Sequence, residues 1–97
     1  MYKKGLVSVI IPTYKRTEML PKAIESVLSQ TYKDVELIVV NDNFPGDEYS
    51  LLLYELMENY ANDERVKFIE QKRHINGAAA RNEGILVATG EYIAFLD

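Results

Sequence analysis

The feature that most constrains the fold is a run of four consecutive apolar residues, Leu-Ile-Val-Val, at positions 37–40. A strand with one face in water alternates apolar and polar residues, whereas a parallel strand covered by helices is apolar on both faces. The run closes a predicted strand over 35–40 and is far shorter than the roughly 20 residues that a membrane-spanning helix needs. It therefore predicts a parallel strand with helices packed on both sides.

Three further segments have the composition of strands. A β-branched run over 6–11 is followed by Pro12, which predicts that the strand ends there. Short apolar runs over 66–69 and 92–96 predict two more strands. Four strands are thus expected along the chain.

Helical periodicity fills the spaces between these strands. Apolar residues at three- and four-residue steps predict a first helix, with Thr17 as its N-cap and an end near Gln30, and a second helix over 52–60. The small-residue segment 77–87 predicts a third. Strands that alternate with helices through short connections indicate right-handed crossovers, and hence one α/β domain over residues 1–97 with a mainly parallel sheet.

Ligands of open α/β sheets bind beyond the carboxyl ends of the strands. The residues that follow the four predicted strands are 13–16, 41–43, 71–76 and Asp97. Two acids, Asp42 and Asp97, are therefore expected to share one rim of the sheet.

Composition excludes several classes of function. With 47% hydrophobic and 27% charged residues the chain is typical of a globular protein. The absence of cysteine rules out disulfides and thiolate metal sites, so a metal would need oxygen ligands or the single histidine, His74. A net charge of −4 argues against nucleic acid as a partner. No transmembrane segment or secretion signal is visible, which fits a cytoplasmic protein.

Four segments carry a resemblance to a known family. Residues 7–16 read VSVIIPTYKR, residues 23–32 read AIESVLSQTY, residues 79–84 read AARNEG and residues 88–97 read ATGEYIAFLD. In this order and spacing they resemble the inverting family-two glycosyltransferases, whose opening is usually written VSVIIPTYNR. The resemblance covers nearly the whole chain. It implies a Rossmann-like GT-A fold, of which this chain is the N-terminal, nucleotide-sugar-binding part.

The resemblance assigns residues to the nucleobase. It implies that Asp42 accepts a hydrogen bond from the base imide N–H, which suits an ionised carboxylate because that group only accepts. An isolated Asp after a strand would otherwise be read as a turn residue. Backbone groups of Pro12, Thr13 and Tyr14 are implied to meet the base, with the Tyr14 ring against it. The family's VDDGS is here Val-Asn-Asp-Asn-Phe at 40–44, a departure that concerns the conformation of the loop.

Two arginines are candidates for the diphosphate. Arg16 and Arg81 carry forked donors that suit phosphate oxygens, although solvation, or a structural ion pair at Arg81, is the plain alternative. The small residues 78–80 favour close packing of a helix on the sheet. They do not form a dinucleotide fingerprint, since no G-x-G-x-x-G or P-loop pattern is present. His74 is expected to be an ordinary loop residue.

The resemblance also implies a metal and an overall reaction. Asp97 is expected to be the first acid of an Asp-x-Asp motif that holds Mg²⁺ or Mn²⁺. The intact enzyme is implied to transfer a sugar from a nucleoside-diphosphate sugar, most simply a UDP-sugar, to a carbohydrate or lipid-linked acceptor hydroxyl with inversion. Attachment of the full-length protein to the inner face of the membrane stays open. Residues 1–97 alone are expected to be inactive and to self-associate through an uncovered side of the sheet.

Other functions fit less well. A signalling receiver domain needs an acidic pair after its first strand, where this chain has Pro12, Thr13 and Tyr14. A nucleotidyltransferase would normally begin with a glycine-rich loop at that place. An inactive binding domain with the same fold stays open.

Overall fold

The structure, a computed structural model, describes residues 2–71 and 77–96. Strands and helices alternate through the described residues in the order β1 (Lys3–Thr13), η1 (Thr17–Met19), α1 (Leu20–Leu28), β2 (Val35–Asn41), α2 (Glu48–Met57), η2 (Glu58–Tyr60), β3 (Val66–Glu70), α3 (Gly77–Val87) and β4 (Gly90–Phe95). The predicted α/β alternation is therefore confirmed. No helix in this part of the chain is long and apolar enough to cross a bilayer.

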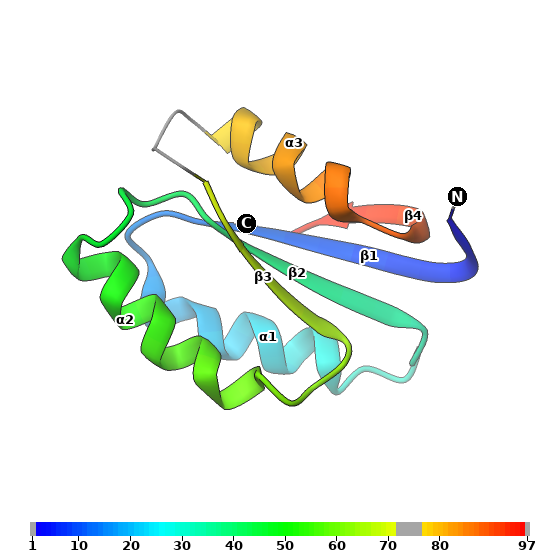
Figure 1. Cartoon of the computed structure of the whole chain (residues 1–97). Helices are drawn as coiled ribbons and strands as arrows, with labels where there is room; N and C mark the ends of the chain where they lie inside the picture. Colours follow the sequence, from blue (N-terminus) through cyan, green and yellow to red (C-terminus); the bar gives the residue numbers. More distant parts are fainter. Residues whose placement is uncertain (1, 72–76, 97) are drawn as a thin grey trace.

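The strands form one parallel sheet in the order β3-β2-β1-β4. Helices α1 and α2 cover one face, and α3 covers the other (Figure 1). The chain moves outward from β1 to β3 and then crosses to the far side of β1, so the strand order reverses beside β1. This is the position at which α/β sheets of this kind bind ligands.

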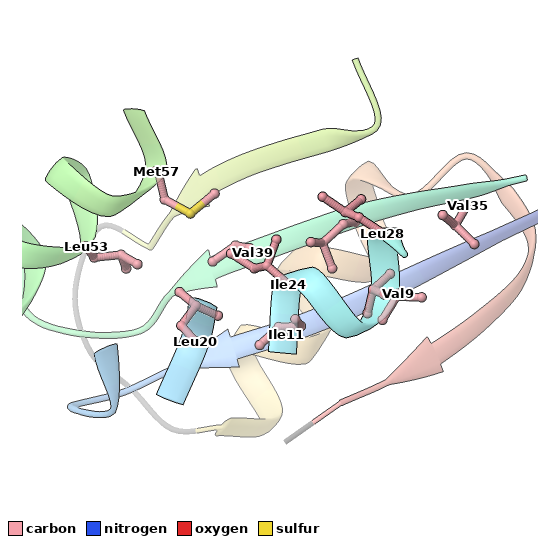
Figure 2. Packing of buried hydrophobic residues seen from close by; sticks show 11 residues of the cluster. Val9, Ile11, Leu20, Ile24, Leu28, Val35, Val39, Leu53 and Met57 are labelled. Atoms are coloured by element: carbon pink, nitrogen blue, oxygen red, sulfur yellow. The ribbon is translucent and has the colours of Figure 1, made fainter. Parts of the chain in front are cut away.

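Strand β2 is buried along its whole length, as the apolar run predicts. Leu37 and Val39 join a cluster with Leu20, Ile24 and Leu28 of α1 and with Leu53 and Met57 of α2, much of which is drawn in Figure 2. Ile38 and Val40 point to the opposite face and pack with Ile10 and Ala80, beneath α3. Each fully buried aliphatic side chain stabilises the fold by roughly 1.5–3 kcal/mol, so this strand is the main source of cohesion between the layers.

Helix α3 approaches the sheet closely because its packing residues are small. A Cβ built on Gly84 would lie 2.6 Å from Cγ2 of Ile10, so only glycine fits without displacement. Ala80 is fully buried, whereas Ala78 is exposed. The packing role expected for residues 78–80 therefore belongs to Ala80 among the three, and to Gly84 one turn later.

The first strand does not end at Pro12, as the sequence predicts. Strand β1 continues through Pro12 to Thr13. The Ile10 carbonyl accepts a hydrogen bond from Leu96, on the β4 side. The backbone nitrogen of Pro12 points to the same side as the backbone groups of Ile10, towards β4. Strand β4 pairs with β1 only as far as Ile10. The N–H that Pro12 lacks therefore costs no hydrogen bond between the described strands.

Thr17 is not the N-cap of α1. It begins the short 3-10 helix η1, and neither η1 nor α1 has a side-chain cap at its first turn. A side-chain cap is present at α2, where Oδ1 of Asp47 accepts a hydrogen bond from the Ser50 N–H at 2.8 Å.

A buried acid ties the amino-terminal halves of the strands together. The Glu36 carboxylate of β2 accepts hydrogen bonds from the Ser8 hydroxyl of β1 and from the Thr89 N–H, the latter at 2.6 Å, and pairs with the Lys67 ammonium of β3 at 2.8 Å. Burial alone would raise the pKa of Glu36, but the bonds from Lys67, Ser8 and Thr89 outweigh it and lower the pKa to about 2. Glu36 thus joins all four strands, since Thr89 immediately precedes β4.

Apolar side chains are exposed on β4 and α3. Tyr92, Ile93 and Phe95 of β4 are 58%, 42% and 46% exposed, and Leu86 of α3 is 76% exposed. Strand β4 is an edge of the sheet as described. The self-association expected from the sequence would use this surface, and it stays a prediction.

Glu36→Gln should remove an acid-sensitive part of the stability. Because the pKa of Glu36 is lowered from 4.5 to about 2 on folding, its stabilisation is complete above pH 4.5 and is lost as the pH falls towards 2. We expect the wild type to exceed the variant by about 1–3 kcal/mol in unfolding free energy at pH 7, and the difference to shrink across that window. Urea unfolding at several pH values measures it. The exposed Glu64→Gln is the control, and a difference that does not change with pH would contradict the account.

Candidate functional site

Backbone hydrogen bonds bring the carboxyl ends of β1, β2 and β3 together. The Asp42 N–H donates to the Thr13 carbonyl at 2.9 Å, and the Gln71 N–H donates to the Asn41 carbonyl at 3.2 Å. The residues that follow three strands therefore lie side by side at one rim, where the sequence analysis expects the ligand. We call this set, made of Thr13, Asp42 and Gln71 with their neighbours Tyr14, Asn41 and Asn43, the strand-end rim.

Asn41 is the fully buried centre of this rim. Its side-chain amide donates to the Ser50 hydroxyl at 2.9 Å and to Oε1 of Glu70 at 3.0 Å. Its side-chain oxygen accepts from the backbone N–H of Asn43 at 2.9 Å. The residue both donates and accepts, which an ionised aspartate cannot do. An amide at this position, where the family pattern has an acid, is thus explained by Glu70 next to it.

Asn43 fixes the loop after β1. Its side-chain oxygen accepts the Lys15 N–H at 2.8 Å. Lys15 has a φ of +59°, in the left-handed region that costs a non-glycine residue about 1–2 kcal/mol. The hydrogen bond from a fully buried Asn43 offsets part of that strain, so the loop after β2 sets the conformation of the loop after β1.

The Lys15 ammonium lies between two tyrosines at the surface beside the rim. It is 5.1 Å from the centre of the Tyr14 ring and 5.7 Å from that of Tyr49. A hydrogen bond with the Tyr14 side chain is the main reason that the pKa of Lys15 lies above 10.5. Tyr14 itself is 38% exposed, so one predicted base-stacking ring is at the surface of the site.

Asp42 is a buried acid held by a buried amide. Asp42 is 2% exposed and Gln71 is 6% exposed. Nε2 of Gln71 donates a hydrogen bond to Oδ1 of Asp42 at 2.8 Å. Because an ionised carboxylate only accepts, the amide nitrogen must face it and the amide oxygen must point elsewhere. The rim therefore presents a carboxylate whose orientation is controlled from β3.

The Thr13 hydroxyl is an unsatisfied polar group next to this pair. Thr13 is 4% exposed, and its Oγ1 is buried with no hydrogen-bond partner among the described residues. A buried hydroxyl without a partner costs about 1–3 kcal/mol, and such groups commonly mark a place for water or a ligand. Thr13 thus places a hydroxyl, which can both donate and accept a hydrogen bond, at the strand-end rim.

The structure gathers some of the predicted site residues and not others. Thr13, Tyr14 and Asp42 belong to the strand-end rim, Pro12 directly precedes Thr13 in β1, and Arg16 is exposed just before η1. Arg81 is half-buried on α3, the helix on the opposite face of the sheet from α1 and α2.

Asp97 and His74 lie outside the described residues. Within 2–71 and 77–96, no three His, Cys, Asp or Glu side chains gather where they could hold a metal ion. The metal prediction therefore depends on Asp97 and gains no support from the other acids.

Sequence reasoning did not assign a role to Gln71 or to the amides of Asn41 and Asn43. Gln71 could have been found by its place, because it is the first residue after β3 and so must reach the same rim. The partners of Asn41 could not, since Glu70 is 29 positions away and no periodic pattern links the two.

Comparisons with known proteins agree with the observed fold. The model of the family described as "Glycosyl transferase family 2" matches residues 8–97. An uncharacterised glycosyltransferase of Rickettsia bellii is 43% identical over 94% of this chain, and the Escherichia coli UDP-Glc:alpha-D-GlcNAc-diphosphoundecaprenol beta-1,3-glucosyltransferase WfaP is 37% identical over 95%. A solved structure, the Pyrobaculum calidifontis mannosyltransferase PcManGT in complex with GDP-Man and Mn²⁺, superimposes with a TM-score of 0.77 at 22% identity, over 94% of this chain.

The chain spans only a part of each of these proteins. It covers 12% of the Rickettsia protein, 34% of the Escherichia coli protein and 26% of the Pyrobaculum chain. The similarity therefore concerns the segment that builds the strand-end rim.

Asn41→Asp should destabilise the rim through Glu70. The new carboxylate would lose the donor to Ser50 and would face the Glu70 carboxylate, at a cost of about 1–3 kcal/mol in unfolding free energy. In a Glu70→Gln background the cost should fall by half or more, because a glutamine amide can donate to the aspartate. Urea unfolding of the four proteins of this double-mutant cycle measures the coupling. The exposed Asn62→Asp is the control, and an equal cost in both backgrounds would contradict the assignment.

Proposed function

The chain belongs to glycosyltransferase family 2, and from that premise we propose that it forms the donor-binding side of a longer enzyme. The proposed enzyme transfers a sugar from a nucleoside-diphosphate sugar, most simply a UDP-sugar, to an acceptor hydroxyl with inversion. The acceptor in this proposal is a carbohydrate or a lipid-linked saccharide, in line with the name of the Escherichia coli relative.

The observation that carries the proposal is the buried Asp42 carboxylate at the meeting point of β1, β2 and β3. Uracil presents a ring N–H between two carbonyls, and a carboxylate fixed beside a strand end is a suitable acceptor for that single donor. In a buried site a bond from an N–H to a charged oxygen is stronger than one between neutral groups. Asp42 is therefore proposed to read the base.

The neighbours of Asp42 are proposed to complete the donor site. The exposed ring of Tyr14 offers a face for the base, and the Thr13 hydroxyl, which has no partner among the described residues, offers a further hydrogen bond. Arg16, after β1, and Arg81, on α3, are proposed to bind the diphosphate through their forked donors.

A divalent cation belongs to the proposal through Asp97. Carboxylate and phosphate oxygens are the ligands that Mg²⁺ and Mn²⁺ prefer, so Asp97 is proposed to hold the ion together with the donor. When bound, the ion neutralises charge that grows on the leaving diphosphate. The base that takes the acceptor's proton is proposed to lie after residue 97, so residues 1–97 alone should bind the donor without transferring the sugar.

Asp42→Asn in the longer enzyme should weaken the binding of UDP. Losing a hydrogen bond to a charged group costs roughly 1.5–3 kcal/mol, so the dissociation constant should rise by about tenfold or more. Isothermal titration calorimetry with UDP measures it. Asp34→Asn, an exposed site just before β2 at the other end of the sheet, is the matched control. Equal affinities of wild type and Asp42→Asn would refute the role of Asp42.

A further inference from the structure

Gln71 is bound to the rim through both its backbone and its side chain. Its N–H donates to the Asn41 carbonyl at 3.2 Å, and its Nε2 donates to Oδ1 of Asp42 at 2.8 Å. The residue is 6% exposed, so its side chain is confined by its surroundings. These two hydrogen bonds, to the last residue of β2 and to the residue after it, leave little freedom for the Gln71 amide to turn.

A carboxylate needs such a restraint if it is to recognise a base edge. Rotation about the terminal torsion of an aspartate side chain is soft, so an unrestrained carboxylate samples a broad range of orientations. A hydrogen bond to a ring N–H weakens steeply as the geometry departs from linear. The amide of Gln71 engages one carboxylate oxygen and thereby sets the plane in which the other lies.

We propose that Gln71 is a positioning residue for recognition of the nucleobase, which orients the Asp42 carboxylate towards the imide N–H of a uracil ring. The inference rests on the proposed function, because it requires that Asp42 reads the base. Gln71, directly after β3, is then a second specificity determinant beside Asp42, directly after β2. Sites built to pair with a ligand N–H discriminate strongly against analogues that lack it, and the restraint on Asp42 is the source of that discrimination here.

A purely structural role is the alternative for the same bond. In that case Gln71 only holds the ends of β2 and β3 together, and its loss would weaken the binding of all nucleotides to the same extent. The two roles differ in one measurable quantity, the penalty for methylating N3 of uracil. Methylation removes the N–H donor, so the penalty reports whether Asp42 is aligned with that position.

The test is a cycle of variants and ligands in the longer enzyme. UDP and N3-methyl-UDP are titrated by calorimetry into the wild type, Gln71→Met and Gln71→Glu. Methionine keeps the length of the side chain without a donor, and glutamate is isosteric but presents an acceptor to Asp42. Gln30→Met and Gln30→Glu are the matched controls, since Gln30 is exposed after α1. Thermal unfolding checks that each variant is folded.

We expect N3-methylation to weaken binding to the wild type and to the Gln30 controls by about tenfold or more. In both Gln71 variants UDP should bind about tenfold more weakly while N3-methyl-UDP changes by less than about threefold, so that the penalty nearly vanishes. A penalty that persists in the Gln71 variants would overturn the positioning role and leave the proposed function standing. Failure of both variants to fold would also overturn it, because the bond would then be required for the fold itself. If the wild type binds N3-methyl-UDP as tightly as UDP, Asp42 does not read the base. The proposed role of Asp42 then fails, and this inference fails with it.

Discussion

Complete burial of β2 is the constraint on which the rest of the structure depends. Its apolar residues hold α1 and α2 on one face and α3 on the other, so every layer contacts this strand. The burial continues past its last apolar residue, to Asn41, Asp42 and Asn43, none of which is more than 2% exposed. Polar groups in such a place need hydrogen-bond partners, because an unsatisfied one costs a large fraction of the net stability of a domain.

The partners of these three residues are what make the rim. Asn41 reaches Ser50 and Glu70, Asn43 reaches the backbone of Lys15, and Asp42 is held by Gln71. These bonds join the end of β2 to α2, to the end of β3 and to the loop after β1. The same interactions that satisfy the buried strand therefore align the ends of β1, β2 and β3 and fix an acid among them. Stability and the proposed binding geometry have a common origin at this rim.

Much of this could be predicted from the sequence, because the deciding signals are local. The apolar run at 37–40 predicts a two-sided strand, and the alternation of segments predicts the parallel sheet. The resemblance of residues 7–16 and 79–84 to the family predicts membership that the family match confirms. Boundaries were less accurate where tertiary context decides. Pro12 stays within β1 because no described β4 residue needs its N–H, and Thr17 enters a 3-10 turn instead of capping α1.

The site was harder to predict than the fold. The sequence predicts Asp42 at the rim because this residue follows a predicted strand. It does not predict the hydrogen bond from Gln71, which joins residues 29 positions apart that no periodic pattern links. In the sequence alone, replacement of the family's first acid by Asn41 indicates only a departure in the conformation of the loop. In the structure it is the amide that Glu70 and Ser50 require.

A crystal structure of the longer enzyme with bound UDP would show whether the buried carboxylate at the end of β2 binds the nucleobase, as we propose. We expect a distance of about 2.7–2.9 Å between N3 of the uracil ring and a carboxylate oxygen of Asp42, with the Gln71 amide still bound to the other oxygen. Well-defined density for UDP with its base away from the strand-end rim, or with Asp42 turned from the ring, would contradict it.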